Sequence, residues 1–119
     1  MQTTLQRALV FAGGLAGAAG VALSAVAAHA GGGNVATAAS FLLAHAPALL
    51  AIGLLGRSRL LAAGGTIALA GLVLFCGDLL MRHYAGSRLF PMAAPAGGTA
   101  MIVGWLAVAA AAFTGTRQG

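Results

Sequence analysis

The sequence predicts an all-α integral membrane protein, a four-helix bundle in which neighbouring helices run antiparallel. Of its 119 residues 61% are hydrophobic, a further 19 are glycine, and only 6% are charged. A chain of this size keeps roughly a third of its unfolded surface exposed, so a soluble fold could not bury so much apolar surface. The apolar residues gather in four stretches, each close to the about 20 residues that cross a bilayer. With a single cysteine, a disulfide-stapled domain is also excluded.

The four predicted spans cover residues 8–28, 35–56, 60–81 and 93–113. At about 20 residues each they use most of the chain, so residues 1–119 are predicted to form a single transmembrane domain. Barrel strands would alternate polar and apolar residues over about 10 positions, and these stretches do not. The short connections between them force consecutive helices to lie antiparallel.

Turn-forming residues mark the ends of these spans. Asn34 follows three glycines and is expected to cap the second helix, as Ser58 is expected to cap the third. Gly56 is expected to end the second helix. Pro95 suits the first turn of the fourth helix, where its missing N–H costs least.

Arginines in the connections predict the orientation, because short cytoplasmic loops carry an excess of positive residues. An orientation with both termini inside (N-in, C-in) places four arginines in the cytoplasm and two outside. The inner ones are Arg7, Arg57, Arg59 and Arg117, and the outer ones are Arg82 and Arg88.

The first 30 residues also allow an alternative interpretation as a secretory signal. They contain Arg7, an apolar run and the sequence Ala28-His29-Ala30, which fits an A-x-A cleavage site. The apolar run is longer than the roughly 7–15 residues of a signal core. This length favours a retained first span.

Small residues recur at every third or fourth position in the first, third and fourth spans. Inside lipid, close packing of small residues holds helices together, because the hydrophobic effect does not act between them. These residues are therefore predicted to lie where helices pack within the chain, with an interface between subunits as the alternative. The predicted packing residues are Gly13, Gly17, Gly20, Gly71, Gly97, Gly98 and Gly104.

Ionisable residues in a membrane are functional candidates by default, and Asp78 is the only acidic residue. It lies four residues before Arg82, which predicts an ion pair between them. A hydrogen bond to the start of the fourth helix is a second structural role. His29 and His83 are expected at the outer ends of their helices, where they could approach Asp78. With Cys76 they have the residue types of a metal site, but no strong motif, and no metal site is predicted.

His45 is expected near the middle of the second span. Pro47 removes a nearby backbone hydrogen bond and leaves the Leu43 carbonyl without its partner. In a structural role, His45 would bond Ser24, a backbone carbonyl or a side chain across the bundle; proton relay and haem ligation are the alternatives. A bis-histidine haem site would need a second copy of the chain, and no cofactor is predicted. Trp105, deep in the fourth span, is interpreted as a packing residue.

Four segments, in this order, resemble the YgdD-like small bacterial membrane proteins. The segments are Ser24-Ala25-Val26-Ala27-Ala28-His29, Phe41 with His45-Ala46, Phe75-Cys76-Gly77-Asp78-Leu79, and Pro95-Ala96-Gly97-Gly98 followed by Gly104-Trp105. The resemblance runs from about Phe11 to Phe113. In that family serines usually stand where this chain has Cys76 and Asp78, so a role for either would be peculiar to this protein. The family is catalogued as a domain of unknown function, so the resemblance implies a fold and no mechanism.

Together these observations predict a small multi-pass protein of the bacterial inner membrane, non-enzymatic, serving as an accessory or structural subunit. Its expected partners are the lipid bilayer and further subunits, as a homo-oligomer or in a larger membrane complex. The net charge of +5 is spread over the membrane flanks, which indicates anionic headgroups and not nucleic acid. No phosphate loop, nucleophile elbow or carboxylate pair is present.

Two alternative functions remain open at this point. One is a small homo-oligomeric channel or transporter for an ion, a proton or a small solute. Asp78, His29 and His83 would then form an outer gate, and His45 the polar group at the midplane. The other is an electron-transfer subunit that binds haem through His45.

Overall fold

The computed structural model describes residues 3–56 and 58–114. They form four helices, α1 (Thr4–Ala30), α2 (Gly33–Leu55), α3 (Arg59–Tyr84) and α4 (Ala93–Ala111). All four are long and apolar enough to cross a membrane, which confirms the predicted number of spans. At about 1.5 Å per residue they measure about 29 to 40 Å, against a hydrocarbon core of about 30 Å.

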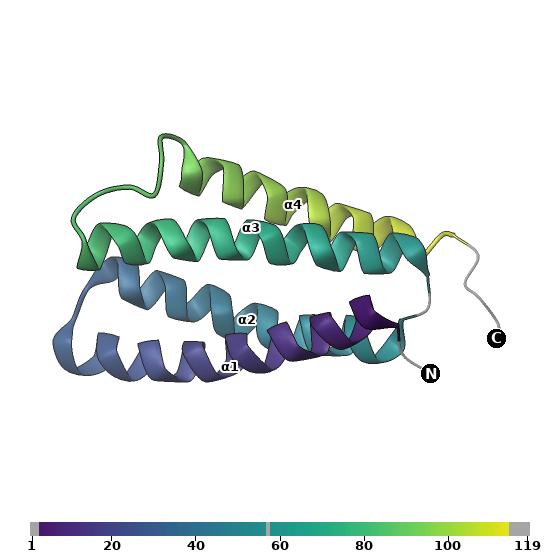
Figure 1. Ribbon diagram of the computed structural model, residues 1–119, viewed down its shortest axis with the longest axis horizontal. Coiled ribbons are helices and arrows are strands. Elements are labelled where there is room, and N and C mark those ends of the chain that lie inside the picture. Colours follow the sequence, from purple (N-terminus) through teal and green to yellow (C-terminus); the bar gives the residue numbers. More distant parts are fainter. Residues whose placement is uncertain (1–2, 57, 115–119) are drawn as a thin grey trace.

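Consecutive helices are antiparallel and packed, as predicted (Figure 1). α1 packs along α2 and α3 packs along α4, so the chain consists of two helical hairpins. The hairpins meet mainly where α2 packs against α3, and α1 touches α3 only slightly. The start of α1 and the end of α4 lie at the same end of the molecule (Figure 1). Of the four arginines expected inside, Arg57 and Arg117 lie outside the described residues.

Most helix ends follow their predicted capping residues. The Ser58 hydroxyl accepts a hydrogen bond from the Leu61 amide at 3.0 Å, and Gly56 ends α2 with a left-handed φ of 49°. The prediction for Asn34 is wrong, because α2 begins at Gly33 and its N-cap is Gly32. Gly32 has a φ of 104°, a region that glycine adopts without strain. The helix is therefore capped two residues earlier than predicted, and Asn34 falls inside its first turn.

The α3–α4 hairpin is held by backbone-to-backbone contact at glycines. A Cβ atom added to Gly71 would lie 2.5 Å from the Gly97 carbonyl oxygen, and one added to Gly104 would lie 2.5 Å from the Ala68 amide nitrogen. Neither position could accept a methyl group unless the two helices moved apart. The small residues thus set the distance between α3 and α4.

The α1–α2 hairpin uses glycines of α1 in the same way. A Cβ on Gly13 would lie 2.9 Å from the Ala46 carbonyl oxygen, and one on Gly20 would lie 2.7 Å from the Leu43 side chain, whereas Gly17 has only ordinary contact. Gly98 does not share this role, because nothing among the described residues lies within 4 Å of its Cβ position. Its neighbour Gly97 faces α3, and one step of about 100° around the helix turns Gly98 away.

The buried core lies where the two hairpins meet. α4 contributes one residue to it, and the other three helices supply the rest. The core cluster consists of Leu9, Ala38, Leu49, Ile52, Leu72, Cys76, Leu79 and Met101.

Candidate functional site

His45 forms a polar bridge between the two hairpins. Its side chain is 7% exposed; the Trp105 indole N–H donates to its Nε2 at 3.0 Å, and its Nδ1 lies 2.8 Å from the Phe41 carbonyl oxygen. An indole N–H can only donate, so Nε2 must be the acceptor. The proton of the neutral ring is then on Nδ1, which donates to Phe41. The Trp105 bond thus joins α4 to α2.

Aromatic rings surround this bridge. The His45 and Trp105 ring centroids are 5.5 Å apart, and those of Phe41 and Phe75 are 4.6 Å apart. In such a low-dielectric setting a hydrogen bond is strong and an unpaired polar group is costly. The expectation of a backbone carbonyl and a side chain across the bundle as partners of His45 is confirmed, with Phe41 and Trp105 in these roles; Ser24 is not a partner in either bond.

Trp105 is the residue that sequence reasoning missed. Its packing role is confirmed in part, since it also donates the hydrogen bond that orients His45. One signal was available: Trp105 is twelve residues after the first residue of α4 (Ala93), and His45 is twelve after the first residue of α2 (Gly33). The two helices run in the same direction, so both residues lie at a similar depth. A mid-membrane indole N–H requires an acceptor.

Asp78 lies fully buried near the C-terminal end of α3. Its Oδ1 accepts a hydrogen bond from the Leu89 amide at 2.7 Å. The predicted ion pair is present, with Arg82 Nη2 2.9 Å from Oδ2. Among the described residues, Oδ2 and the Arg82 Nε have no hydrogen-bond partner. The carboxylate therefore ties the α3–α4 connection to α3, slightly before the expected contact with α4 itself.

His29 and His83, near the C-terminal ends of α1 and α3, do not join Asp78 in a cluster. His83 packs over the α1–α2 turn, where a Cβ on Gly32 would lie 2.7 Å from the imidazole Cε1, and its ring meets Tyr84 edge-on. His29 is exposed at the end of α1. Within residues 3–56 and 58–114 no three His, Cys, Asp or Glu side chains come close enough to hold a metal ion.

Cys76 connects α3 to α2. Its thiol is buried and donates a weak hydrogen bond to the Ala38 carbonyl oxygen, with an Sγ–O distance of 3.6 Å. A small side chain at this position lets the two helices approach closely. The thiol thus belongs to the packing between the hairpins.

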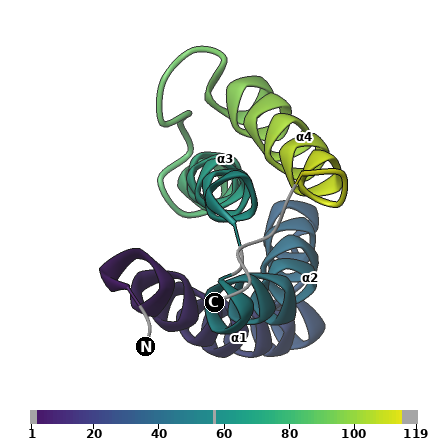
Figure 2. The same cartoon turned by 90° about the vertical axis from the view of Figure 1, so that its right-hand side faces the viewer.

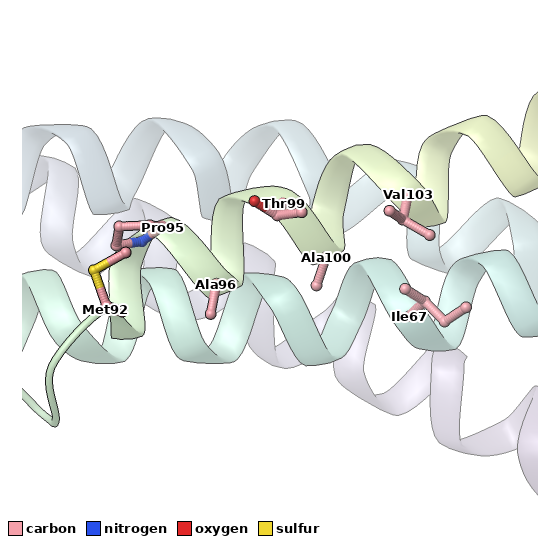
Figure 3. Close-up of a pocket in the computed structure, with 7 residues that line it drawn as sticks. All are labelled: Ile67, Met92, Pro95, Ala96, Thr99, Ala100 and Val103. Atoms are coloured by element: carbon pink, nitrogen blue, oxygen red, sulfur yellow. The ribbon is translucent and has the colours of Figure 1, made fainter.

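An open apolar hollow lies on the outer face of the second hairpin (Figure 3). Most of its lining comes from one face of α4, and Ile67 of α3 borders it. It is lined by Ile67, Met92, Pro95, Ala96, Thr99, Ala100 and Val103.

One family of proteins matches this chain. The family is described as "Protein of unknown function (DUF423)", and it matches residues 16–98. That region contains His45, Asp78 and Arg82 and ends before Trp105. No solved structure matches the chain. Because the match covers more than half of the sequence, and because all four helices can span a bilayer, the protein is a four-span membrane protein that belongs to the DUF423 family, the group of unknown activity that contains the YgdD-like proteins.

Proposed function

We propose that this chain is a non-enzymatic accessory or structural protein of the bacterial inner membrane, with both termini in the cytoplasm, acting in a homo-oligomer or a larger membrane complex. The observation that carries the proposal is at His45, where both ring nitrogens are engaged, one with Phe41 and one with Trp105. A haem ligand needs a ring nitrogen with a free lone pair, and a proton relay needs neighbours that take up and release protons. A backbone carbonyl only accepts a hydrogen bond and an indole N–H only donates one. Of the two bonds, the one from Trp105 to Nε2 holds the hairpins together, and the one to Phe41 stays within α2.

The environment of Asp78 supports the same proposal. A carboxylate that carries an ion has to be reached by that ion, and Asp78 is 0% exposed. Its oxygens face the Leu89 amide and the Arg82 guanidinium. These contacts fix a connection in place, which is what a structural role requires.

The proposal is tested by reconstituting the purified protein into liposomes and lipid nanodiscs. In liposomes, entrapped pH- and cation-sensitive dyes report flux, and we expect the same rates as in protein-free vesicles. In nanodiscs, native mass spectrometry reports the size of the assembly, and we expect more than one polypeptide per particle. An absorption spectrum of the purified protein checks for haem.

Each rival function predicts a different result. Flux that disappears in Asp78→Asn, with helical content unchanged, would establish a channel or transporter. A Soret band that disappears in His45→Ala would establish a haem protein. A single polypeptide per particle, with neither flux nor partner, would overturn the assembly role.

A further inference from the structure

The two hairpins are built on the same helix–helix contact. In the first, a Cβ on Gly13 of α1 would lie 2.9 Å from the carbonyl oxygen of Ala46 on α2. In the second, a Cβ on Gly64 of α3 would lie 2.8 Å from the carbonyl oxygen of Gly104 on α4. The next contact also matches. The amide nitrogens of Leu50 and Val108, one turn further along α2 and α4, would lie 3.0 and 2.9 Å from the same two Cβ atoms. The hairpins therefore correspond, with Gly13 equivalent to Gly64 and Ala46 equivalent to Gly104.

This equivalence extends along both helix pairs. Gly20 of α1 corresponds to Gly71 of α3, and a Gly-Gly pair opens the contact in each helix, at 13–14 and 64–65. On α2 and α4 the residues that face the hairpin partner correspond as well, and all are buried. These pairs are Val35 with Ala93, Ala39 with Gly97, Ala46 with Gly104, and Gly53 with Ala111.

The hairpins differ in what covers their other faces. α3 buries a second stripe against the first hairpin, whereas the equivalent stripe of α1 is exposed. The buried stripe is Gly65, Leu72, Cys76 and Leu79, and its exposed equivalents are Gly14, Val21, Ala25 and Ala28. Similarly, α2 buries a stripe that is exposed on α4. The α2 stripe is Ala38, His45 and Ile52, and its exposed equivalents are Ala96, Val103 and Ala110.

The α2–α3 contact thus occurs once in the chain. The two surfaces that could form a second such contact, the stripe on α4 and the stripe on α1, are both exposed. The hollow of Figure 3 contains Ala96 and Val103. In the first hairpin, the equivalent surface is the α2 stripe, and α3 packs against it. The helix equivalent to α3 is α1, and within the described residues α1 and α4 do not pack against each other (Figure 2). No helix of the same chain therefore covers the hollow.

We propose that the α3–α4 hollow of one chain binds α1 of a second copy, and that this contact repeats the internal α2–α3 contact between chains. It is a head-to-tail contact, because it joins different faces of the two copies. This inference rests on the proposed function, an assembly of several subunits. It adds which subunit is the partner, a second copy of this chain, and which surfaces meet. Small residues suit it, since close van der Waals packing drives helix association in lipid.

The fit at Gly14 illustrates the contact. Its equivalent on α3, Gly65, receives the Ile52 side chain of α2, whose Cγ2 would lie 3.0 Å from an added Cβ. Gly14 has nothing within 4 Å of its own Cβ position in the described chain. In the proposed contact this space receives α4 of the second copy near Ala110, the equivalent of Ile52.

Disulfide cross-linking tests the contact directly. Cys76 is the free cysteine of the described chain and is first replaced by alanine. Ala25→Cys and Ala96→Cys are then introduced in separate, differently tagged copies and co-expressed. Their equivalents, Cys76 and Ala38, are in direct contact, with an Sγ–O distance of 3.6 Å. We expect oxidation in membranes to yield a cross-linked dimer that carries both tags.

A matched control pair uses exposed residues at a comparable depth that point away from the two stripes. Ala22→Cys on α1 and Ile102→Cys on α4 meet this condition. We expect no cross-link from this pair, and none from Ala25→Cys or Ala96→Cys expressed alone. A cross-link from either single variant alone would mean that like faces meet, which overturns the head-to-tail contact.

A steric variant provides a second test. Gly14→Trp places a large side chain where the described chain has open space, so the monomer can fold, but the hollow of a second copy can no longer reach α1. Leu15→Trp, at the next and 54% exposed position, is the control. In nanodiscs we expect Gly14→Trp to shift native mass spectra to the monomer, and Leu15→Trp to leave them unchanged.

The outcomes separate this inference from the proposed function. If the chain assembles but Ala25→Cys and Ala96→Cys do not cross-link and Gly14→Trp has no effect, this interface is wrong and the accessory role stands. If the protein is a monomer that conducts ions, both fail.

Discussion

At the scale of single residues, the polar groups of this protein hold a helix or a connection in place. The two ring nitrogens of His45 are hydrogen-bonded to Phe41 and Trp105. The carboxylate of Asp78 accepts a hydrogen bond from Leu89 and pairs with Arg82. An unpaired polar group in hydrocarbon costs several kcal/mol, roughly what a lost hydrogen bond costs in a dry medium. Each such group therefore restricts how its helix can rotate or slide.

The His45–Trp105 bond should show a measurable coupling energy. In a double-mutant cycle with Trp105→Phe and His45→Phe, we expect a coupling of about 0.6 kcal/mol and at most about 1.7 kcal/mol, the range of side-chain hydrogen bonds within membranes. The measurement is the free energy of unfolding in mixed micelles for the four variants. Nitrogen NMR of the wild type should also show a neutral ring with its proton on Nδ1.

The control for this cycle pairs Trp105→Phe with Ser24→Ala, since Ser24 takes part in neither bond. These two changes should be additive within about 0.5 kcal/mol, as expected for independent sites. A His45 ring protonated on Nε2, or a coupling indistinguishable from that of the control, would contradict the assigned bond.

Asp78 should matter more for the α3–α4 connection than for α3 itself. Asp78→Ala removes the acceptor of the Leu89 amide, and a buried donor left unpaired costs about 1–3 kcal/mol. Asp78→Asn keeps an oxygen for that amide and loses only the attraction to Arg82, so we expect a smaller loss of thermal stability. Trypsin cleavage after Arg88, in the connection, should be fastest in Asp78→Ala. Equal cleavage rates in both variants would show that the carboxylate does not hold the connection.

The sequence predicts which residues could act here but not which of them meet. The Asp78–Arg82 pair follows from a spacing of four residues on one helix. The His45–Trp105 pair depends on how α2 and α4 are rotated about their axes, and both helices are apolar on all sides. Without a polar face to orient them, packing at glycines decides the rotation. The partner of His45 was therefore left open between three kinds of group.

At the scale of helices, length and hydropathy decide most of the structure. The four spans are predicted correctly because a membrane admits only long apolar helices or closed barrels. Helix ends depend on local competition between residues, and there the prediction for Asn34 fails. Gly32 can adopt the positive φ of the turn, so it takes the cap position. The prediction for Gly98 fails for a related reason. Which glycine of the pair 97–98 faces α3 depends on the rotation of α4 about its axis, and the sequence does not give that rotation.

That pair provides a sharp test of the packing. Gly97→Ala should lower the free energy of unfolding by about 1–3 kcal/mol, the usual cost of overpacking, because its Cβ would lie 2.6 Å from the Phe75 amide nitrogen. Gly98→Ala meets open space and should leave stability unchanged or raise it by up to about 1 kcal/mol, the helix preference for alanine. Thermal unfolding in nanodiscs compares them. A larger loss for Gly98→Ala would mean that α4 is rotated differently or packs against another subunit there.

At the scale of the whole molecule, two equivalent hairpins are joined by a contact that uses one stripe of α2 and one of α3 and leaves their equivalents on α4 and α1 exposed. The exposed stripes on α1 and α4 would be unremarkable beside lipid if they stood alone. Their equivalence to the buried stripes of α3 and α2 is the reason for proposing a second copy as their partner. Such a contact would bury both stripes, which accords with the proposed accessory role in the membrane.

At the scale of the whole molecule, the arginines predict the orientation in the membrane. α1 begins and α4 ends at the end of the bundle where Arg7 and Arg59 lie, and Arg88 lies in the α3–α4 connection at the other end. The excess of four arginines against two, counted over the full sequence, favours a cytoplasmic location for the first end. In a Cys76→Ala background, a membrane-impermeant maleimide added to spheroplasts should label Ser87→Cys, in the connection, but not Leu55→Cys at the end of α2.

Opening the spheroplasts should make Leu55→Cys reactive, which controls for burial of the thiol, since Leu55 is 59% exposed. Replacing Arg7 and Arg59 by glutamine reduces the bias from four against two to two against two, counting all six arginines of the sequence. Because an arginine bias sets the orientation of multi-pass proteins, the double variant should label at both positions in intact spheroplasts, as a mixed population would. If, with all six arginines kept, Ser87→Cys stays protected and Leu55→Cys is labelled from outside, the termini face outward and the orientation is reversed. If the double variant keeps a single orientation, then the remaining positive charges, and not the pair at Arg7 and Arg59, set it.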